Sequence, residues 1–213
     1  MVFRMVGFYN YTVLLTYFGV VSAMLGVGLA MYGRTSMAIV CLMISGFCDL
    51  FDGSVARTRK RTESEQKFGI QIDSLADMIC FGVLPAAIGF SIGLTRWYES
   101  AALIVYVLSA LIRLAYYNVT EDELEFCEGT RRVYYDGLPV TTVALIIPLI
   151  YTLRPVMKSG FLLLYALCLL VTAAAFLLKV KVRKLGMRGM IAAAFVGLGV
   201  LVLLIAGWNC VAV

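Results

Sequence analysis

Residues 49–77 read DLFDGSVARTRKRTESEQKFGIQIDSLAD and carry four aspartates on either side of a polar stretch. Asp49 and Asp52 end one long apolar run, and Asp73 and Asp77 begin the next. If both runs are helices, the spacing of three residues in the first pair and four in the second puts each pair on one helical face. The stretch therefore predicts two acidic helix faces joined by a hydrophilic loop.

Small residues accompany both acidic faces. Gly53 and Ala56 follow Asp49 at helical spacing, and Gly69 precedes Asp73 by four residues. Residues with little or no side chain allow a bulky ligand to approach the carboxylates closely. The chain contains no histidine, and its six cysteines show no C-x-x-C spacing, so a zinc site is not expected. Oxygen-only ligands indicate a hard divalent cation such as Mg²⁺ or Mn²⁺.

The composition indicates an integral membrane protein. Of the 213 residues, 62% are hydrophobic and the mean hydropathy is +0.93, against about 45–50% apolar residues in soluble domains. We predict an all-α, polytopic transmembrane bundle: one membrane domain over 1–213, a catalytic core over about 11–180, and at least one additional C-terminal helix. The first apolar run has no small-residue cleavage site after it, so no removable signal peptide is expected. Apolar runs of spanning length occur at 11–32, 35–56, 69–93, 98–118, 139–155, 160–179 and 189–208.

The basic residues predict the orientation of these spans. If all seven runs cross the membrane, thirteen lysines and arginines lie on one side and four on the other, with Arg113 inside a span. The richer side is expected to be cytoplasmic. It holds the N-terminus and the polar stretch between the two aspartate pairs. Residues 119–138, which open with an acidic run, are predicted to form a solvated loop on that same side.

Two classes of function fit four intramembrane aspartates. Such residues are costly to bury and usually functional. A cation or proton transporter would spread its carboxylates along a path across the membrane, whereas these four cluster at one boundary. Arg57, next to the small-residue face, is suited to hold a phosphate. The pattern favours a metal-dependent enzyme that acts on a phosphorylated lipid, and a carboxylate-dependent transporter remains the distant alternative.

The same residues resemble a known family. The pattern D-x-x-D-G-x-x-A-R followed by G-x-x-x-D-x-x-x-D is the signature of the CDP-alcohol phosphatidyltransferases. It reads here Asp49-Leu-Phe-Asp52-Gly53-Ser-Val-Ala56-Arg57, then Gly69-Ile-Gln-Ile-Asp73-Ser-Leu-Ala-Asp77. Eleven residues separate the two halves, where the family usually has about eight, and an interhelical loop tolerates such insertions.

Further stretches resemble the membrane-embedded phosphatidylserine synthases, a branch of this family. They are DSLADMICFGVLPA at 73–86, RLAYYN at 113–118 and GLPV at 137–140. Together with the signature, the similarity covers most of 40–145. The first apolar run departs from the proline-asparagine pattern common in the branch, with Thr12-Val13 in its place.

The resemblance implies a metal-dependent transfer of a phosphatidyl group from CDP-diacylglycerol to L-serine, with release of CMP. In the family, a site for two divalent ions corresponds to Asp49, Asp52, Asp73 and Asp77, and Asp77 is also the general base. Asp49, Asp52, Gly53, Ala56, Arg57 and Gly69 correspond to the positions that bind the CDP-linked donor. The resemblance further implies a homodimer in a prokaryotic cell membrane, with a cytoplasmic active site and no nucleic-acid partner.

Serine brings a carboxylate and an ammonium group, so its pocket needs a cation. Arg113 is the first candidate, with Asn118, Arg131 and Arg132 as further candidates. For Arg113, a structural ion pair is the competing interpretation. The acceptor could instead be glycerol 3-phosphate, inositol phosphate or another alcohol. A phosphorylated acceptor needs a larger basic pocket, and the chain offers few cations near the site.

Overall fold

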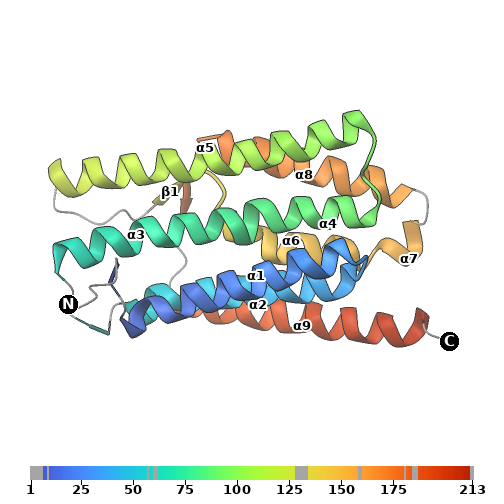
Figure 1. The fold of residues 1–213 in the computed structure, drawn as a ribbon, viewed down its shortest axis with the longest axis horizontal. Helices are drawn as coiled ribbons and strands as arrows, with labels where there is room; N and C mark the ends of the chain where they lie inside the picture. The colour runs from blue at the N-terminus through green and yellow to red at the C-terminus, as the bar shows by residue number, and fades with distance from the viewer. Residues whose placement is uncertain are drawn as a thin grey trace, which may run out of the picture.

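The computed structural model describes residues 7–8, 10–56, 58–59, 62–127, 134–157, 160–179, 181–183 and 187–211, which form a bundle of helices (Figure 1). The elements, in chain order, are η1 (Tyr11–Val13), α1 (Leu14–Met31), α2 (Thr35–Ala56), α3 (Glu63–Asp77), the π-helix η2 (Met78–Val83), α4 (Leu84–Ile92), α5 (Trp97–Cys127), β1 (Tyr134–Asp136), η3 (Val140–Thr142), α6 (Val143–Tyr151), α7 (Arg154–Met157), α8 (Phe161–Leu177), β2 (Lys181–Arg183) and α9 (Met187–Val211).

The predicted all-α membrane bundle is confirmed. In the part of the chain that the structure describes, four apolar helices are long enough to cross a membrane: Leu14–Met31, Thr35–Val55, Glu63–Ile92 and Trp97–Thr120. Three shorter apolar stretches of helix follow at Val140–Tyr151, Phe161–Leu177 and, within α9, Ile191–Leu204. Each overlaps one of the predicted apolar runs. Large hydrophobic side chains such as Phe18, Leu25 and Leu163 are exposed on the outside of the bundle, as a lipid-facing surface requires.

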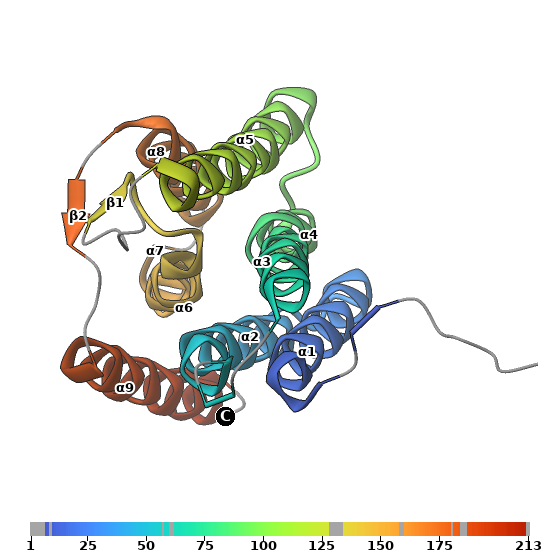
Figure 2. The same ribbon diagram turned by 90° about the vertical axis from the view of Figure 1, so that its left-hand side faces the viewer.

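The helices form two sides with a layer between them (Figure 2). On one side α1 packs against α2, and α9 contacts α2 and α6. On the other side α5 packs against α8. The continuous α3–η2–α4 helix runs between these sides and contacts α1, α2 and α5. This central position brings the second aspartate pair against α2, which carries the first.

The helix that carries Asp73 and Asp77 begins at Glu63, six residues before the predicted apolar run. Thr62 starts it with a capping box: its hydroxyl accepts from the Glu65 backbone N–H, and the Glu65 carboxylate accepts from the Thr62 N–H. The polar first turns therefore extend the helix beyond its apolar part. Asp73 lies ten residues, about 15 Å, from the helix start.

The prediction of a loop beginning at residue 119 is wrong. Helix α5 continues to Cys127, because residues 119–127 contain no glycine or proline and include several good helix formers. The sequence pattern also did not predict the two short strands. Strand β1 pairs antiparallel with β2, with Tyr135 opposite Val182, and so joins the segment after α5 to the segment after α8.

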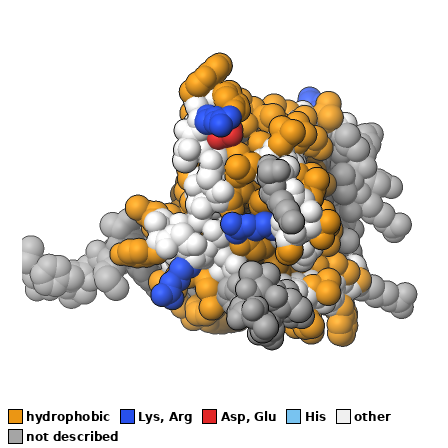
Figure 3. Space-filling model, turned by 90° about the vertical axis from the view of Figure 1, so that its right-hand side faces the viewer, with side chains coloured by type: hydrophobic (Ala, Val, Ile, Leu, Met, Phe, Trp, Pro, Cys, Tyr) orange, Lys and Arg blue, Asp and Glu red, His pale blue; other side chains and the backbone are white. Residues whose placement is uncertain are grey.

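The connections between helices lie at the two ends of the bundle. The α2–α3 connection and the β1–β2 ribbon lie at the end that faces the viewer in Figure 2. At the opposite end, Arg34, Arg96 and Arg154 lie in turns or at a helix start. Figure 3 shows that basic side chains are sparse on that face among hydrophobic ones.

Close packing of α1 yields a stability prediction. A Cβ added at Gly26 would lie 2.9 Å from the Cys41 Cβ and 3.0 Å from a Leu84 methyl, whereas nothing lies within 4 Å of a Cβ at Gly28. Gly26→Ala should therefore destabilise the protein by about 1–3 kcal/mol through overpacking. Gly28→Ala, two residues along the same helix, should be neutral or stabilising by up to about 1 kcal/mol. Thermal unfolding in detergent measures both, and equal effects would contradict the packing of α1 described above.

Candidate metal centre

All four aspartates of the signature line one small cavity. Asp49 and Asp52 come from the last two turns of α2, and Asp73 and Asp77 from the second half of α3. The cavity has a volume of about 10 Å³, close to the space that one water molecule needs. Its wall also contains Thr16 from α1 and Phe81 from η2, so four elements enclose the carboxylates.

Three of the carboxylates converge. Oxygens of Asp49, Asp52 and Asp73 all lie within 4.8 Å of one another, and Asp52 is only 8% exposed. Asp77 lies outside this group of three, with its carboxyl group next to that of Asp49. Asp52 and Asp73 form a second such pair. The two helices are thus connected by two pairs of carboxyl groups that face each other.

This arrangement fits a divalent cation. The donor set is rich in carboxylate oxygen, the type of ligand that Mg²⁺ and Mn²⁺ prefer. Carboxylates this close repel one another unless protons or cations lie between them. The convergence of three acidic oxygens therefore provides a centre that can bind a metal ion, with Asp77 next to it.

Helix α1 supplies a site residue that sequence reasoning missed. The Thr16 hydroxyl donates to Asp52 Oδ2 at 3.2 Å, and the Thr16 side chain is buried. A polar residue in a largely apolar helix was a usable signal, since buried hydroxyl groups need a partner. At the same end, Asn10 donates to Glu65 Oε1 at 2.7 Å and so ties the segment before α1 to the start of α3.

The small residues of the signature lie where the helices end or approach one another. Gly53 is exposed in the last turn of α2, and nothing lies within 4 Å of a Cβ built there. Gly69 is half-buried on α3, one turn before Asp73. Ala56 is the last residue of α2, and Arg57 lies outside the described residues.

Of the four candidates for the serine pocket, the structure describes Arg113 and Asn118. Arg113 is buried on α5, and its guanidinium donates to the Gly137 carbonyl at 3.5 Å. The Asn118 Oδ1 accepts a 2.8 Å hydrogen bond from Ser74, which lies between Asp73 and Asp77 on α3. Asn118 therefore connects α5 directly to the acidic face. Arg131 and Arg132 lie outside the described residues.

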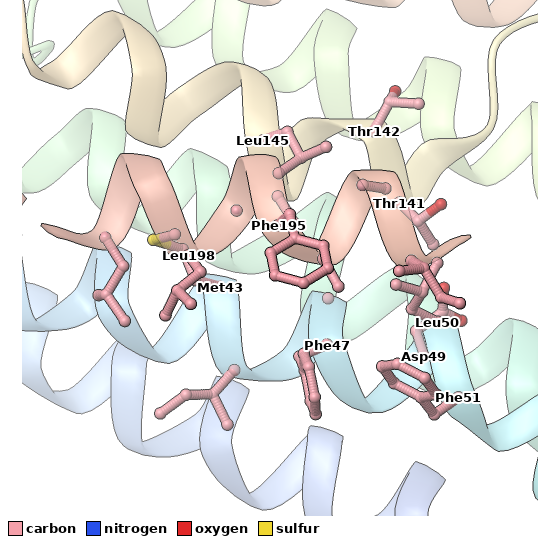
Figure 4. A pocket seen from close by; sticks show the side chains of 18 of the residues that line it. Met43, Phe47, Asp49, Leu50, Phe51, Thr141, Thr142, Leu145, Phe195 and Leu198 are labelled. Carbon is pink, nitrogen blue, oxygen red and sulfur yellow. The ribbon is translucent and has the colours of Figure 1, made fainter. Parts of the chain in front are cut away.

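A second, larger pocket lies on the other side of α2, between α2, α6 and α9. Its volume is about 460 Å³, and most of its lining is apolar, including Phe47, Leu145 and Phe195. Figure 4 shows Asp49 at the end of the pocket where Thr141 lies, with Met43 and Leu198 farther along. Among the described residues, Asp49 alone lines both this apolar groove and the acidic cavity.

Parts of this sequence are similar to known proteins. A CDP-diacylglycerol–serine O-phosphatidyltransferase of Saccharomyces cerevisiae is 42% identical over 115 residues, which cover 53% of this chain and 41% of the yeast protein. A protein of the same name from Helicobacter pylori is 35% identical over 121 residues, covering 53% of this chain and 45% of its own length. A third, from Bacillus subtilis, is 23% identical over 141 residues, covering 65% of this chain and 74% of the relative.

The match to the yeast and Helicobacter proteins spans less than half of their length. A family model covers more of the chain. The model described as CDP-alcohol phosphatidyltransferase matches residues 9–173, which include α1 to α7, most of α8 and all four aspartates. The chain therefore belongs to the CDP-alcohol phosphatidyltransferase family.

Proposed function

We propose that the protein transfers a phosphatidyl group from CDP-diacylglycerol to L-serine and releases CMP. The observation that carries this proposal is the cavity formed by four signature aspartates, one of which also lines an apolar groove. Membership of the family supports the reaction type, and the names of the similar proteins support serine as the acceptor.

Asp49, Asp52, Asp73 and Asp77 would hold two divalent ions, Mg²⁺ or Mn²⁺. When bound, these ions would hold the diphosphate of the donor and neutralise charge on the leaving CMP phosphate. The chain supplies the geometry: α2 and α3 present the carboxylates from opposite walls, and Thr16 orients Asp52.

Asp77 would act as the general base. The serine hydroxyl oxygen forms a bond to the β-phosphorus of the donor while the bond to the CMP oxygen breaks. The hydroxyl proton passes to the Asp77 carboxylate, and the bonding electrons leave with CMP. Its position beside the group of three carboxylates, in contact with Asp49, suits a residue that faces both the metal centre and an incoming hydroxyl.

The donor would lie along α2. Its CDP part would contact Gly53, Ala56, Arg57 and Gly69, and among the described residues nothing lies within 4 Å of a Cβ built at Gly53. An acyl chain fits the apolar groove, whose lining is contributed by α2, α6 and α9. Because Asp49 stands at one end of that groove, a lipid tail in the groove would place the diphosphate beside the Asp49 carboxylate.

The acceptor would bind on the side of α5, with the serine carboxylate at Arg113 and with Asn118, Arg131 and Arg132 as further contacts. Asn118 supports this placement through its bond to Ser74, which sits on the aspartate-bearing helix. We further propose a homodimer in a prokaryotic cell membrane with its active site on the cytoplasmic side. The excess of basic residues at that end supports the orientation.

The reaction itself is tested by CMP release from purified protein with CDP-diacylglycerol and Mn²⁺, offered serine, glycerol 3-phosphate or inositol phosphate in turn. Serine alone should support release. Asp77→Asn should lower turnover by about 10²–10⁴-fold, the range expected for loss of a general base. Asp73→Asn, one turn earlier on the same helix, should weaken Mn²⁺ binding more than Asp77→Asn does. Release with another acceptor alone would contradict the serine assignment, and equal loss of Mn²⁺ affinity would contradict the separate role of Asp77.

The groove is tested by filling it from α9. Gly197 lines the pocket, and a Cβ there would lie 3.4 Å from a Leu145 methyl, whereas nothing lies within 4 Å of a Cβ at the exposed Gly199. Gly197→Phe should raise the KM for a long-chain donor by about tenfold, equivalent to about 1.4 kcal/mol. It should change the KM for a short-chain CDP-diacylglycerol much less. Gly199→Phe is the matched control, and the same KM increase in both variants would place the lipid chain elsewhere.

The acceptor side is tested with Arg113→Lys, which keeps the charge but loses the planar, two-pronged hydrogen bonding of arginine. The KM for serine should rise about tenfold, a loss of about 1.4 kcal/mol, with little change in that for CDP-diacylglycerol. Steady-state kinetics with each substrate varied in turn measures the two constants. A parallel rise in both would show that Arg113 supports the fold through Gly137 instead of binding serine.

A further inference from the structure

A π-helical segment follows the acidic face without a break. Asp77 is the last residue of α3, and η2 occupies Met78–Val83 before α4 begins at Leu84. The Leu84 N–H donates to the Ile79 carbonyl, five residues back, where an α-helix would use the residue four back. Such a turn accommodates one extra residue and is found frequently at functional sites. Its position fixes how the acidic face is rotated relative to α4.

Two residues explain why the chain holds this register. Pro85 has no N–H, so the carbonyl of Phe81 lacks the donor that an α-helix would supply from four residues ahead. The Tyr106 hydroxyl, from α5, donates to that carbonyl instead. Tyr106 is fully buried, so this bond forms away from solvent. The hydroxyl thus stabilises the carbonyl in the position that the π segment gives it.

Phe81 connects this bond to the acidic cavity. Its side chain is 1% exposed and lines the cavity together with the four aspartates. It also lies close to α2, because a Cβ on Gly46 would be 3.8 Å from the Phe81 ring. The next element, α4, is held separately: the Tyr165 hydroxyl from α8 donates to the Pro85 carbonyl at 2.9 Å. With α4 fixed, losing the extra residue of the π turn would rotate Asp77 by about 100° relative to it.

We propose that Tyr106 is a positioning residue for the metal centre. Its hydroxyl, through the Phe81 carbonyl, holds the π register that turns Asp73 and Asp77 toward Asp49 and Asp52. This proposal rests on the proposed function only in that the aspartates bind the metal ions. Tyr165 offers a matched comparison, since it makes the same kind of bond, equally buried, to a helix that carries no aspartate.

The test compares Tyr106→Phe with Tyr165→Phe in the full chain, purified in detergent. Calorimetric titration with Mn²⁺ alone measures the affinity of the metal centre, and CMP release measures kcat. Tyr106→Phe should weaken Mn²⁺ binding about tenfold and lower kcat at least tenfold, because the aspartates lose their common orientation. Tyr165→Phe should lower the unfolding temperature to a similar extent but leave Mn²⁺ affinity within twofold of the wild type. Wild-type Mn²⁺ affinity in Tyr106→Phe, or equal losses in both variants, would overturn the proposal.

A second variant tests whether Tyr106 positions the aspartates or only gives the buried Phe81 carbonyl a hydrogen-bond donor. Adding Pro85→Ala to Tyr106→Phe gives residue 85 an N–H, which can bond the Phe81 carbonyl in an α-helical register. The double variant should regain thermal stability while its Mn²⁺ affinity stays low. If Tyr106→Phe alone does not fold, the double variant is compared with Tyr165→Phe in its place. Recovery of both properties would overturn the proposal. If the wild type binds Mn²⁺ but releases no CMP with any acceptor, the proposed function fails while the comparison of Mn²⁺ affinities still decides the role of Tyr106.

Discussion

The mutual repulsion of four aspartates is the constraint on which the rest of the structure depends. Three carboxylates have oxygens within 4.8 Å of one another. At an effective dielectric constant of about 20, two unit charges at that separation repel by about 3.5 kcal/mol. Three such pairs together approach the whole stability of a typical domain, about 5–15 kcal/mol. The cluster is therefore compatible with the fold only when cations or protons balance its charge. Binding of either one removes the repulsion and so stabilises the folded protein.

The surrounding helices hold the carboxylates together against that repulsion. Helix α1 is fixed on α2 by two hydroxyl groups that bond across the pair: Ser22 donates to the Cys41 carbonyl, and Ser45 donates to the Gly19 carbonyl. These bonds fix the position of α1 along the axis of α2, and therefore the position of Thr16 beside Asp52. Helix α3 is fixed from the other side by Asn118 of α5. The acidic faces are therefore held by neutral hydrogen bonds, which need no counter-charge of their own and leave the carboxylates available to a cation.

Local signals in the sequence predicted much of this arrangement. The spacing of Asp49 and Asp52, and of Asp73 and Asp77, placed each pair on one helical face, and the apolar runs located the helices. Features that depend on contacts between segments far apart in the chain could not be predicted from these local signals. The role of Thr16, the pairing of β1 with β2 and the groove behind Asp49 depend on which helices become neighbours. Helix ends were misplaced where helix-forming polar residues continue past the apolar run, as in α5, because hydropathy reports burial in lipid and not helix length.

The position of Asp49 explains how a small bundle could join substrates from two phases. On the proposed function, the donor is dissolved in the membrane and the acceptor in water, so the reacting centre must be open to both. Helix α2 meets this requirement with two different surfaces near its end. One surface lines the apolar groove with α6 and α9, and the other closes the acidic cavity with α1 and α3. Because Asp49 borders both, a lipid lying in the groove would end with its polar head beside one carboxylate of the proposed metal centre. Helices α6 and α9 form the wall of this groove, without which this surface of α2 would face lipid directly.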